Sequence, residues 1–164
     1  MDAVIMNASN DAREMVELAS CLYSEGFENI IIFSHLDERD FFLIQISLYE
    51  SGVNAIPLKC GKGEKTSDLI KAIKGSLTGS FLLVYSPSIC AYDIVASRAL
   101  HRGSCKCATL ILGESKLYGV YLESEIFDYL EITSSLEREA LPRIFADDEG
   151  GVYYLSSYEI EQQN

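Results

Sequence analysis

The chain has 164 residues, of which 48% are hydrophobic and 23% charged, a composition typical of a folded globular domain and not of a disordered tail. Its 13 lysines and arginines face 25 aspartates and glutamates, and the net charge of −12 disfavours partners with a phosphate backbone or an anionic lipid surface. No apolar run approaches the roughly 20 residues that cross a bilayer, and the first residues lack a secretory signal. We therefore expect a single domain over residues 1–164, located in the cytoplasm, with no nucleic-acid or membrane partner.

Short apolar runs alternate with segments of helical periodicity through the first two thirds of the chain. The runs predict strands at residues 1–8, 29–34, 53–60, 81–85 and 106–112. Helices are predicted between them at residues 12–24, 36–50, 67–77 and 89–101. Because this alternation requires crossover connections, the predicted fold class is α/β, with a Rossmann-like, three-layer, mostly parallel sheet and helices on both faces.

Individual residues support these boundaries. Side chains at residues 9–11 can cap the first helix, and the continuous apolar run at residues 30–33 is typical of a strand buried on both faces. Pro57 places its strand near a sheet edge or a strand end. After Gly113 the rhythm changes, and the remaining elements are predicted as a strand at 117–122, helices at 125–129 and 136–145, an acidic turn at 146–151 and a strand at 152–155.

The five cysteines are Cys21, Cys60, Cys90, Cys105 and Cys107. Their odd number and irregular spacing predict reduced thiols. His101 lies near Cys105 and Cys107, which raises the possibility of a zinc site, but a structural zinc ion usually needs four ligands in paired spacing. We favour buried thiols on one face of a strand, and predict no metal ligands.

A series of motifs runs through the chain in a fixed order. They are Met1-Asp2-Ala3-Val4-Ile5-Met6, Gly26-Phe27-Glu28-Asn29-Ile30-Ile31-Ile32, Phe81-Leu82-Leu83-Val84, Ala99-Leu100-His101-Arg102-Gly103, Ala108-Thr109-Leu110, Gly119-Val120-Tyr121-Leu122, Glu125-Ile126-Phe127-Asp128-Tyr129-Leu130 and Ser135-Leu136-Glu137-Arg138-Glu139-Ala140-Leu141-Pro142-Arg143. This order resembles the sugar-phosphate nucleotidylyltransferase family, which makes NDP-sugars from a sugar 1-phosphate and a nucleoside triphosphate. The resemblance implies a nucleotidyltransferase (GT-A-like) architecture and Mg²⁺-dependent transfer.

The positions that bind substrate in that family differ here. The first strand leads into residues 7–13 without the glycine-rich, basic loop whose N–H groups and cations hold a triphosphate, and Asp11 adds a negative charge there. Tyr85-Ser86-Pro87 stands where the family has asparagine-glycine-aspartate, so proline replaces the Mg²⁺-binding carboxylate. The family's later tryptophan-containing metal segment has no counterpart, because the chain contains no tryptophan.

One loop retains a possible nucleotide contact. Residues 61–66, Gly-Lys-Gly-Glu-Lys-Thr, stand where the resemblance places the loop that approaches the nucleotide base, with Gly63 as the single matching position. The loop lacks the spacing of a phosphate-binding P-loop, and we favour a plain solvated turn for these residues. Gly63 is therefore the one candidate cofactor-binding residue, and no catalytic or metal-ligating residue is predicted.

Other polar residues have simpler explanations. His101 and Arg102 suit the negative end of a helix, and residues 147–149 suit an exposed acidic turn. Ser86 and Ser88 lack the surroundings of a catalytic nucleophile.

The tyrosines gather late in the chain, at Tyr118, Tyr121, Tyr153, Tyr154 and Tyr158. They form either an association face or the half-buried face of a strand pair.

Three functional hypotheses follow. The first is a catalytically degenerate nucleotidyltransferase-like protein that acts as a regulatory or scaffolding subunit, with a protein partner or as a homo-oligomer, and needs no cofactor. The second is a divergent active sugar-1-phosphate nucleotidylyltransferase, with Mg²⁺ held by acidic residues such as Asp93. The third is a small α/β sensing or signalling module, although Asp37 and Asp93 lack the acidic neighbour that a phosphoacceptor site needs.

Overall fold

The computed structural model describes residues 1–114 and 116–155 of the chain. The strands are β1 (Asp2–Met6), β2 (Ile30–Ser34), β3 (Ala55–Lys59), β4 (Phe81–Val84), β5 (Ala108–Leu112), β6 (Leu117–Leu122) and β7 (Gly150–Tyr154). The helices are α1 (Ala12–Ser24), α2 (Glu38–Ser51), α3 (Thr66–Ala72), α4 (Ile94–Ser104), α5 (Ile126–Glu131) and α6 (Leu141–Ala146), with short turns of other helix types at η1 (Lys74–Ser76), η2 (Pro87–Ala91) and η3 (Leu136–Ala140). Within the described ranges, no helix has the length and apolar character needed to span a membrane.

The seven strands form one mixed sheet in the order β3-β2-β1-β4-β6-β5-β7. β6 runs antiparallel to both of its neighbours, and all other adjacent pairs are parallel. β3 lies at the edge, as Pro57 predicted. The Asn54 carbonyl and the Cys60 N–H both bond to the β2 side, so the backbone of Pro57, which has no N–H to donate, faces the open edge.

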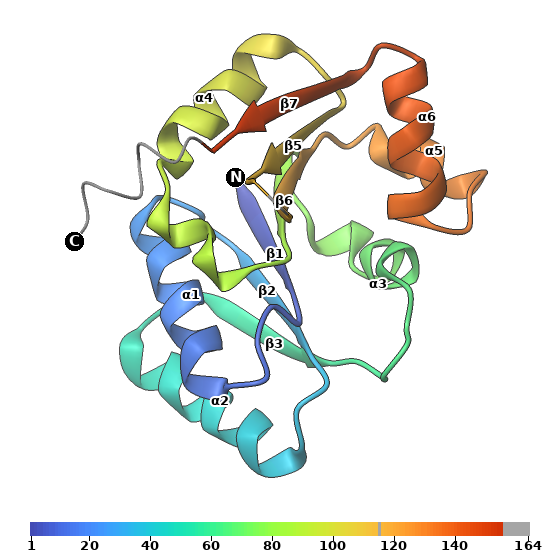
Figure 1. The fold of residues 1–164 in the computed structure, drawn as a ribbon. Helices are drawn as coiled ribbons and strands as arrows, with labels where there is room; N and C mark the ends of the chain where they lie inside the picture. The colour runs from blue at the N-terminus through green and yellow to red at the C-terminus, as the bar shows by residue number, and fades with distance from the viewer. Residues whose placement is uncertain (115, 156–164) are drawn as a thin grey trace.

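Side chains alternate between the two faces of the sheet and build two cores. Ala3 and Ile5 contact the core under α1, α2 and α4, whereas Val4 between them contacts the core under α3, α5 and α6. Figure 1 shows the two groups of helices on opposite sides of the strands. The predicted three-layer α/β architecture is confirmed.

Aspartates begin the three longest helices. Asp11, Asp37 and Asp93 each accept a hydrogen bond from a backbone N–H in the first turn of α1, α2 and α4 respectively, at 2.8 to 2.9 Å. The helix predicted at 89–101 is divided, because the extended Tyr92 and the N-cap residue Asp93 separate η2 from α4. The helix predicted at 136–145 begins as the π-type turn η3, and Pro142, which has no N–H to donate, lies in the first turn of α6.

Asp2 is a buried carboxylate that the sequence did not single out. Its oxygens accept hydrogen bonds from the Asn29 side chain at 2.9 Å and from the backbone and hydroxyl of Thr78 at 2.7 and 2.9 Å. These bonds join the start of β1 to the segments before β2 and β4. The network therefore holds together the starts of the adjacent strands β2, β1 and β4.

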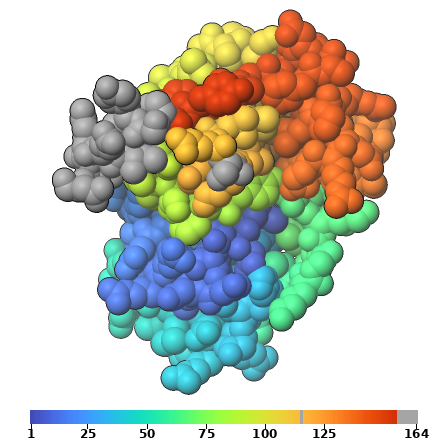
Figure 2. All heavy atoms as spheres, viewed as in Figure 1, coloured from blue at the N-terminus to red at the C-terminus, as the bar shows by residue number. Residues whose placement is uncertain are grey.

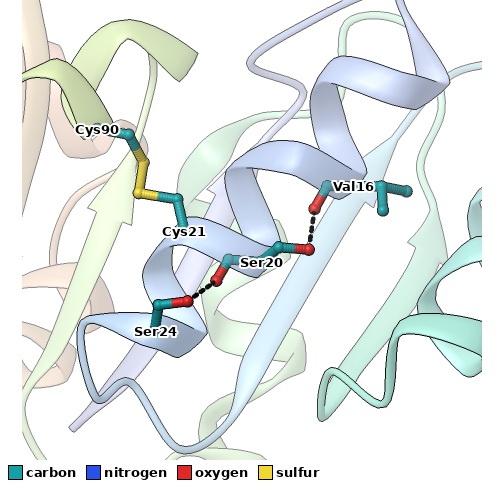
Figure 3. Close-up of a disulfide and its surroundings, with 5 residues drawn as sticks. All are labelled: Val16, Ser20, Cys21, Ser24 and Cys90. Atoms are coloured by element: carbon teal, nitrogen blue, oxygen red, sulfur yellow. Dashed lines mark hydrogen bonds between the residues drawn. A yellow bond between two sulfur atoms is a disulfide. The ribbon is translucent and has the colours of Figure 1, made fainter.

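A disulfide corrects the expectation of reduced cysteines. Cys21 on α1 is bonded to Cys90 in η2, across a sequence separation of 69 residues, while Cys60, Cys105 and Cys107 are free thiols. Figure 3 shows the bond crossing between the two elements, beside Ser20 and Ser24, whose hydroxyls donate to backbone carbonyls of α1. The number and spacing of the cysteines could not reveal this pair, because only the packing of η2 against α1 brings Cys21 and Cys90 together.

One smaller expectation is also corrected. Cys105 and Cys107 do not share a strand face, because Cys105 is the exposed, left-handed residue that ends α4 and Cys107 is buried before β5. Of the two alternatives for the tyrosines, the half-buried face fits three of them, because Tyr118, Tyr121 and Tyr153 all pack against the same core, whereas Tyr154 is exposed. Tyr158 lies outside the described residues.

Candidate functional site

A cavity of about 380 Å³ lies where the carboxyl ends of β1, β2, β3 and β4 meet. In open α/β sheets this edge is the usual place for ligands. Its walls are formed by Met6, Asn7, His35, Cys60, Gly61, Lys62, Gly63, Glu64, Thr66, Leu69 and Tyr85. The loop at residues 61–66, which the resemblance places near a nucleotide base, lines this cavity. Asn7 and His35, which the sequence analysis did not identify, line it too.

Asn7, which follows β1, and His35, which follows β2, are in contact and join the ends of these two strands. Asn7 has a left-handed backbone with a φ of 47°, and its N–H donates to the Phe33 carbonyl at 2.9 Å. Its side-chain oxygen accepts from the His35 N–H at 3.3 Å, and its amide nitrogen lies 3.4 Å from His35 Nε2. The turn after β1 is thus held by side-chain bonds, in the place where a phosphate-binding loop would present free N–H groups.

The N-terminus of α1 is already occupied by an acidic cap. The Asp11 carboxylate accepts from the Arg13 N–H at 2.8 Å, and Ser9 Oγ accepts from the Asp11 N–H at 3.0 Å. A helix N-terminus attracts an anion through its unpaired N–H groups and its positive dipole end. Here the chain's own carboxylate takes that position, which lowers the affinity of this helix end for phosphate.

The loop from Gly61 to Thr66 is folded around Glu64. One Glu64 oxygen accepts from the Gly61 N–H at 2.8 Å, and Gly63 has a φ of 86°, a conformation that L residues rarely adopt. Burial and the Glu64 charge raise the pKa of the neighbouring Cys60 thiol, so this thiol stays protonated at neutral pH. Among the described residues of the cavity wall, Lys62 is the one lysine or arginine.

Tyr85 connects the end of β4 to η3. Its hydroxyl donates to the Glu137 carboxylate at 2.8 Å, and the pKa of Tyr85 is raised well above its usual value by burial first and then by Glu137. The phenol therefore remains a neutral donor at physiological pH. This bond keeps the phenol across one wall of the cavity.

The segment after β4 carries no metal-binding carboxylate. Ser86 is buried, and its hydroxyl lies 3.1 Å from Lys116 Nζ, while Pro87 begins η2. Glu64 is the one carboxylate among the described residues that line the cavity, and its bond to Gly61 N–H already engages it. Because Mg²⁺ prefers several oxygen ligands in octahedral geometry, this donor set does not fit the Mg²⁺ that the resemblance implies.

The other candidate residues lie away from this cavity. Asp37 and Asp93 are helix caps, and the exposed turn at 147–149 contributes Asp148 to an ion pair with Lys106. His101 lies in the last turn of α4, near the start of β5, at the end of the sheet opposite this cavity. It is buried, whereas a cation that only offsets the helix dipole would be exposed. Within residues 1–114 and 116–155, no three His, Cys, Asp or Glu side chains are grouped to hold a metal ion.

No known protein-family profile matches the sequence, and no curated protein matches it significantly. Solved structures do match the fold. A provisionally assigned glucose-1-phosphate thymidylyltransferase from Bacillus anthracis is 10% identical with a TM-score of 0.69, over 95% of this chain and 87% of that one. A 4-diphosphocytidyl-2C-methyl-D-erythritol synthase from Anaerococcus prevotii is 12% identical with a TM-score of 0.66, over 97% and 88% of the two chains.

The inositol-1-phosphate CTP transferase from T. maritima is 11% identical with a TM-score of 0.63, over 98% of this chain and 93% of that one. The fold is therefore that of sugar-phosphate nucleotidylyltransferases and related nucleotide transferases, as the resemblance predicted. Activity does not follow from the fold alone, because chemistry depends on the residues of the site.

Proposed function

We propose that this chain is a catalytically degenerate protein of nucleotidyltransferase fold, which acts by associating with another protein as a regulatory or scaffolding subunit. The loss of catalytic function is inferred from the end of β1. There the chain passes through Asn7 directly to the acidic cap of α1. Transfer to or from a nucleoside triphosphate depends on positioning the phosphates and neutralising their charge. Among the described residues that line the cavity, Lys62 is the one cation that could neutralise phosphate, and the Glu64 carboxylate opposes it.

Calorimetric titration with Mg²⁺ and each nucleoside triphosphate tests this inference. We expect no saturable binding with a Kd below about 1 mM, because phosphate and metal would lack their usual partners. Any weaker nucleotide contact is expected at Lys62 and Gly63, and should disappear in Lys62→Ala. Lys71→Ala, an exposed lysine on α3 outside the cavity, is the matched control. A Kd in the micromolar range for a magnesium nucleotide would contradict the proposal that the chain is catalytically degenerate.

The proposed association with another protein is based on α2, whose outer surface carries four large apolar side chains. Phe42, Leu43, Ile46 and Tyr49 are exposed, Tyr49 to 90%, while Ile44 and Leu48 face the core. Figure 2 shows the α2 segment (cyan) at the lower end of the molecule. The exposed residues recur at helical spacing, which forms a continuous stripe that we name the α2 face. Large apolar side chains grouped in this way mark interaction surfaces in folded proteins.

The charge of the chain indicates the kind of partner. A net charge of −12 makes two copies repel each other, most strongly at low ionic strength. The edge strand β3 next to α2 also resists pairing with another strand, because Pro57 offers no N–H there. We therefore propose that the α2 face binds a different protein, neutral or basic in charge, through side-chain packing.

Paired substitutions on two helices test this interface. Phe42→Ser with Tyr49→Ser is expected to reduce the amount of an identified, copurifying partner at least about tenfold, because central aromatic residues contribute most of the binding energy. Val95→Ser with Leu100→Ser, two exposed apolar residues of α4, is the matched control and should leave binding unchanged. Sedimentation of the pure protein should show a monomer. Self-association abolished by the α2 pair would instead make the partner a second copy.

A further inference from the structure

A trough of about 540 Å³ lies between α1 and α2, which pack side by side on one face of the sheet (Figure 1). It is lined by residues 10–13, 16 and 17 at the start of α1 and by Asp40, Leu43 and Ser47 of α2. All of these residues are exposed or half-buried, so the trough is open to solvent. It shares no lining residue with the cavity at the carboxyl ends of β1 to β4.

The centre of the trough is apolar. Val16 of α1 packs against the core beneath it, and Leu43 of α2 is 45% exposed. The small side chains of Ala12 and Ser47 leave room above the helix backbones. Leu43 is also a member of the α2 face, so the trough and the α2 face adjoin.

The two helices that border the trough carry most of the net charge of the chain. Residues 9–52 hold nine acidic residues against two arginines, a net charge of −7 out of −12. All of them lie in α1, α2 or the turns beside these helices. In the trough Arg13 is paired with Glu17 at 3.0 Å, and within the described part of the chain neither Asp11 nor Asp40 forms an ion pair. The trough therefore combines an apolar centre with negatively charged borders.

This combination is complementary to an amphipathic helix with basic borders. Two helices packed side by side leave a groove that accepts a third, and an amphipathic helix in a groove is a common mode of recognition. A strand is a poorer occupant, because Pro57 offers no N–H at the sheet edge next to α2. A nucleic acid or an anionic lipid surface would be repelled by the charge of α1 and α2.

We propose that the protein partner binds through a basic amphipathic helix that lies in the trough between α1 and α2. The apolar side of this helix contacts Val16 and Leu43, and its lysines or arginines lie at Asp11, Glu17 and Asp40. The inference rests on the association through α2 proposed above, and it specifies the element with which the partner binds. Because the carboxylates also act at a distance, association should be fastest at low ionic strength.

A synthetic helix of about 18 residues, or five turns, is the probe, with leucines along one side and lysines on both borders. Fluorescence anisotropy at about 0.15 M salt is expected to show one peptide bound per chain, with a Kd below about 100 μM. A scrambled peptide of the same composition keeps the charge and loses the apolar side. A peptide with glutamate in place of lysine keeps the apolar side and reverses the charge. Both should bind at least about tenfold more weakly.

Substitutions on the protein locate the bound peptide. Leu43→Ser is expected to weaken binding at least about tenfold, because it removes an apolar contact at the centre of the trough. Leu100→Ser on α4 is the matched control, since the two leucines are exposed to 45% and 46%, and it should leave binding unchanged.

A second pair of variants tests the carboxylates. Glu17→Gln with Asp40→Asn should weaken binding at least about tenfold, because each change removes a charge that the lysines would meet. Asp128→Asn with Glu131→Gln changes the net charge equally on exposed residues of α5, on the opposite face of the sheet, and should have less than about a twofold effect.

The outcomes separate this inference from the proposed function. No saturable binding of the leucine–lysine peptide below about 1 mM, or equal binding of the scrambled peptide, would overturn the trough as a helix site. Equal binding to Leu43→Ser and Leu100→Ser would also overturn it. If the copurifying partner is still lost from Phe42→Ser with Tyr49→Ser, the association through α2 stands without it. A partner unaffected by changes at Phe42, Leu43 and Tyr49 would overturn both.

Discussion

Replacing Cys90 with serine is expected to lower the free energy of unfolding by about 4 kcal/mol. The disulfide with Cys21 closes a loop that spans 69 residues, and a crosslink over such a length removes much of the conformational freedom of the unfolded chain. The loop contains all of β2, α2, β3, α3 and β4. Denaturant unfolding under non-reducing conditions measures the effect.

Two controls separate the crosslink from the side chain. Cys60→Ser removes a free thiol and should change the stability by less than about 1 kcal/mol. Reductant should lower the stability of the unmodified protein to that of Cys90→Ser and leave the variant unchanged. Thiol titration of the unfolded, unreduced chain should detect Cys60, Cys105 and Cys107 alone. Detection of five reactive thiols, or equal stability of the unmodified protein and Cys90→Ser without reductant, would show that the disulfide does not form.

The order of elements could be predicted because hydrophobic periodicity is a local property. The run at residues 30–33 was identified as a doubly buried strand and is the interior strand β2, and the proline at 57 identified the edge strand β3. Helix division was harder to predict. The break between η2 and α4 depends on Asp93 acting as a cap, and the π-type turn of η3 precedes Pro142 in α6, two details that periodicity does not encode.

Long-range pairings were beyond prediction for a different reason. The Cys21–Cys90 bond and the Asp2–Thr78 hydrogen bonds join residues that are far apart in the sequence, and only the sheet order brings them together. Asp2 precedes the apolar run Ala3-Val4-Ile5-Met6. From the sequence alone it is read as an exposed residue at the start of the strand, not as a buried one. Its burial becomes understandable only once the Asn29 and Thr78 donors are placed around it.

The candidate site was partly predictable. The position of the Gly61 to Thr66 loop at the cavity followed from its place after the third strand, because carboxyl ends of parallel strands share one edge. Asn7 and His35 gave no comparable signal, since neither belongs to a recognisable motif. His101 was interpreted as a helix-end cation, whereas the structure buries it beside Glu123, a contact across 22 positions that no local pattern indicates.

The central claim is that the sheet edge that serves nucleotide transfer in this fold no longer supports it. Measurement of pyrophosphate released from each nucleoside triphosphate, with sugar 1-phosphates and Mg²⁺ present, tests this most directly. The account predicts no release above the protein-free control, whereas an enzyme turning over at about 10 per second would be detected easily. Pyrophosphate release proportional to protein concentration, and lost in Lys62→Ala or Glu64→Gln, would contradict it and establish a divergent active enzyme.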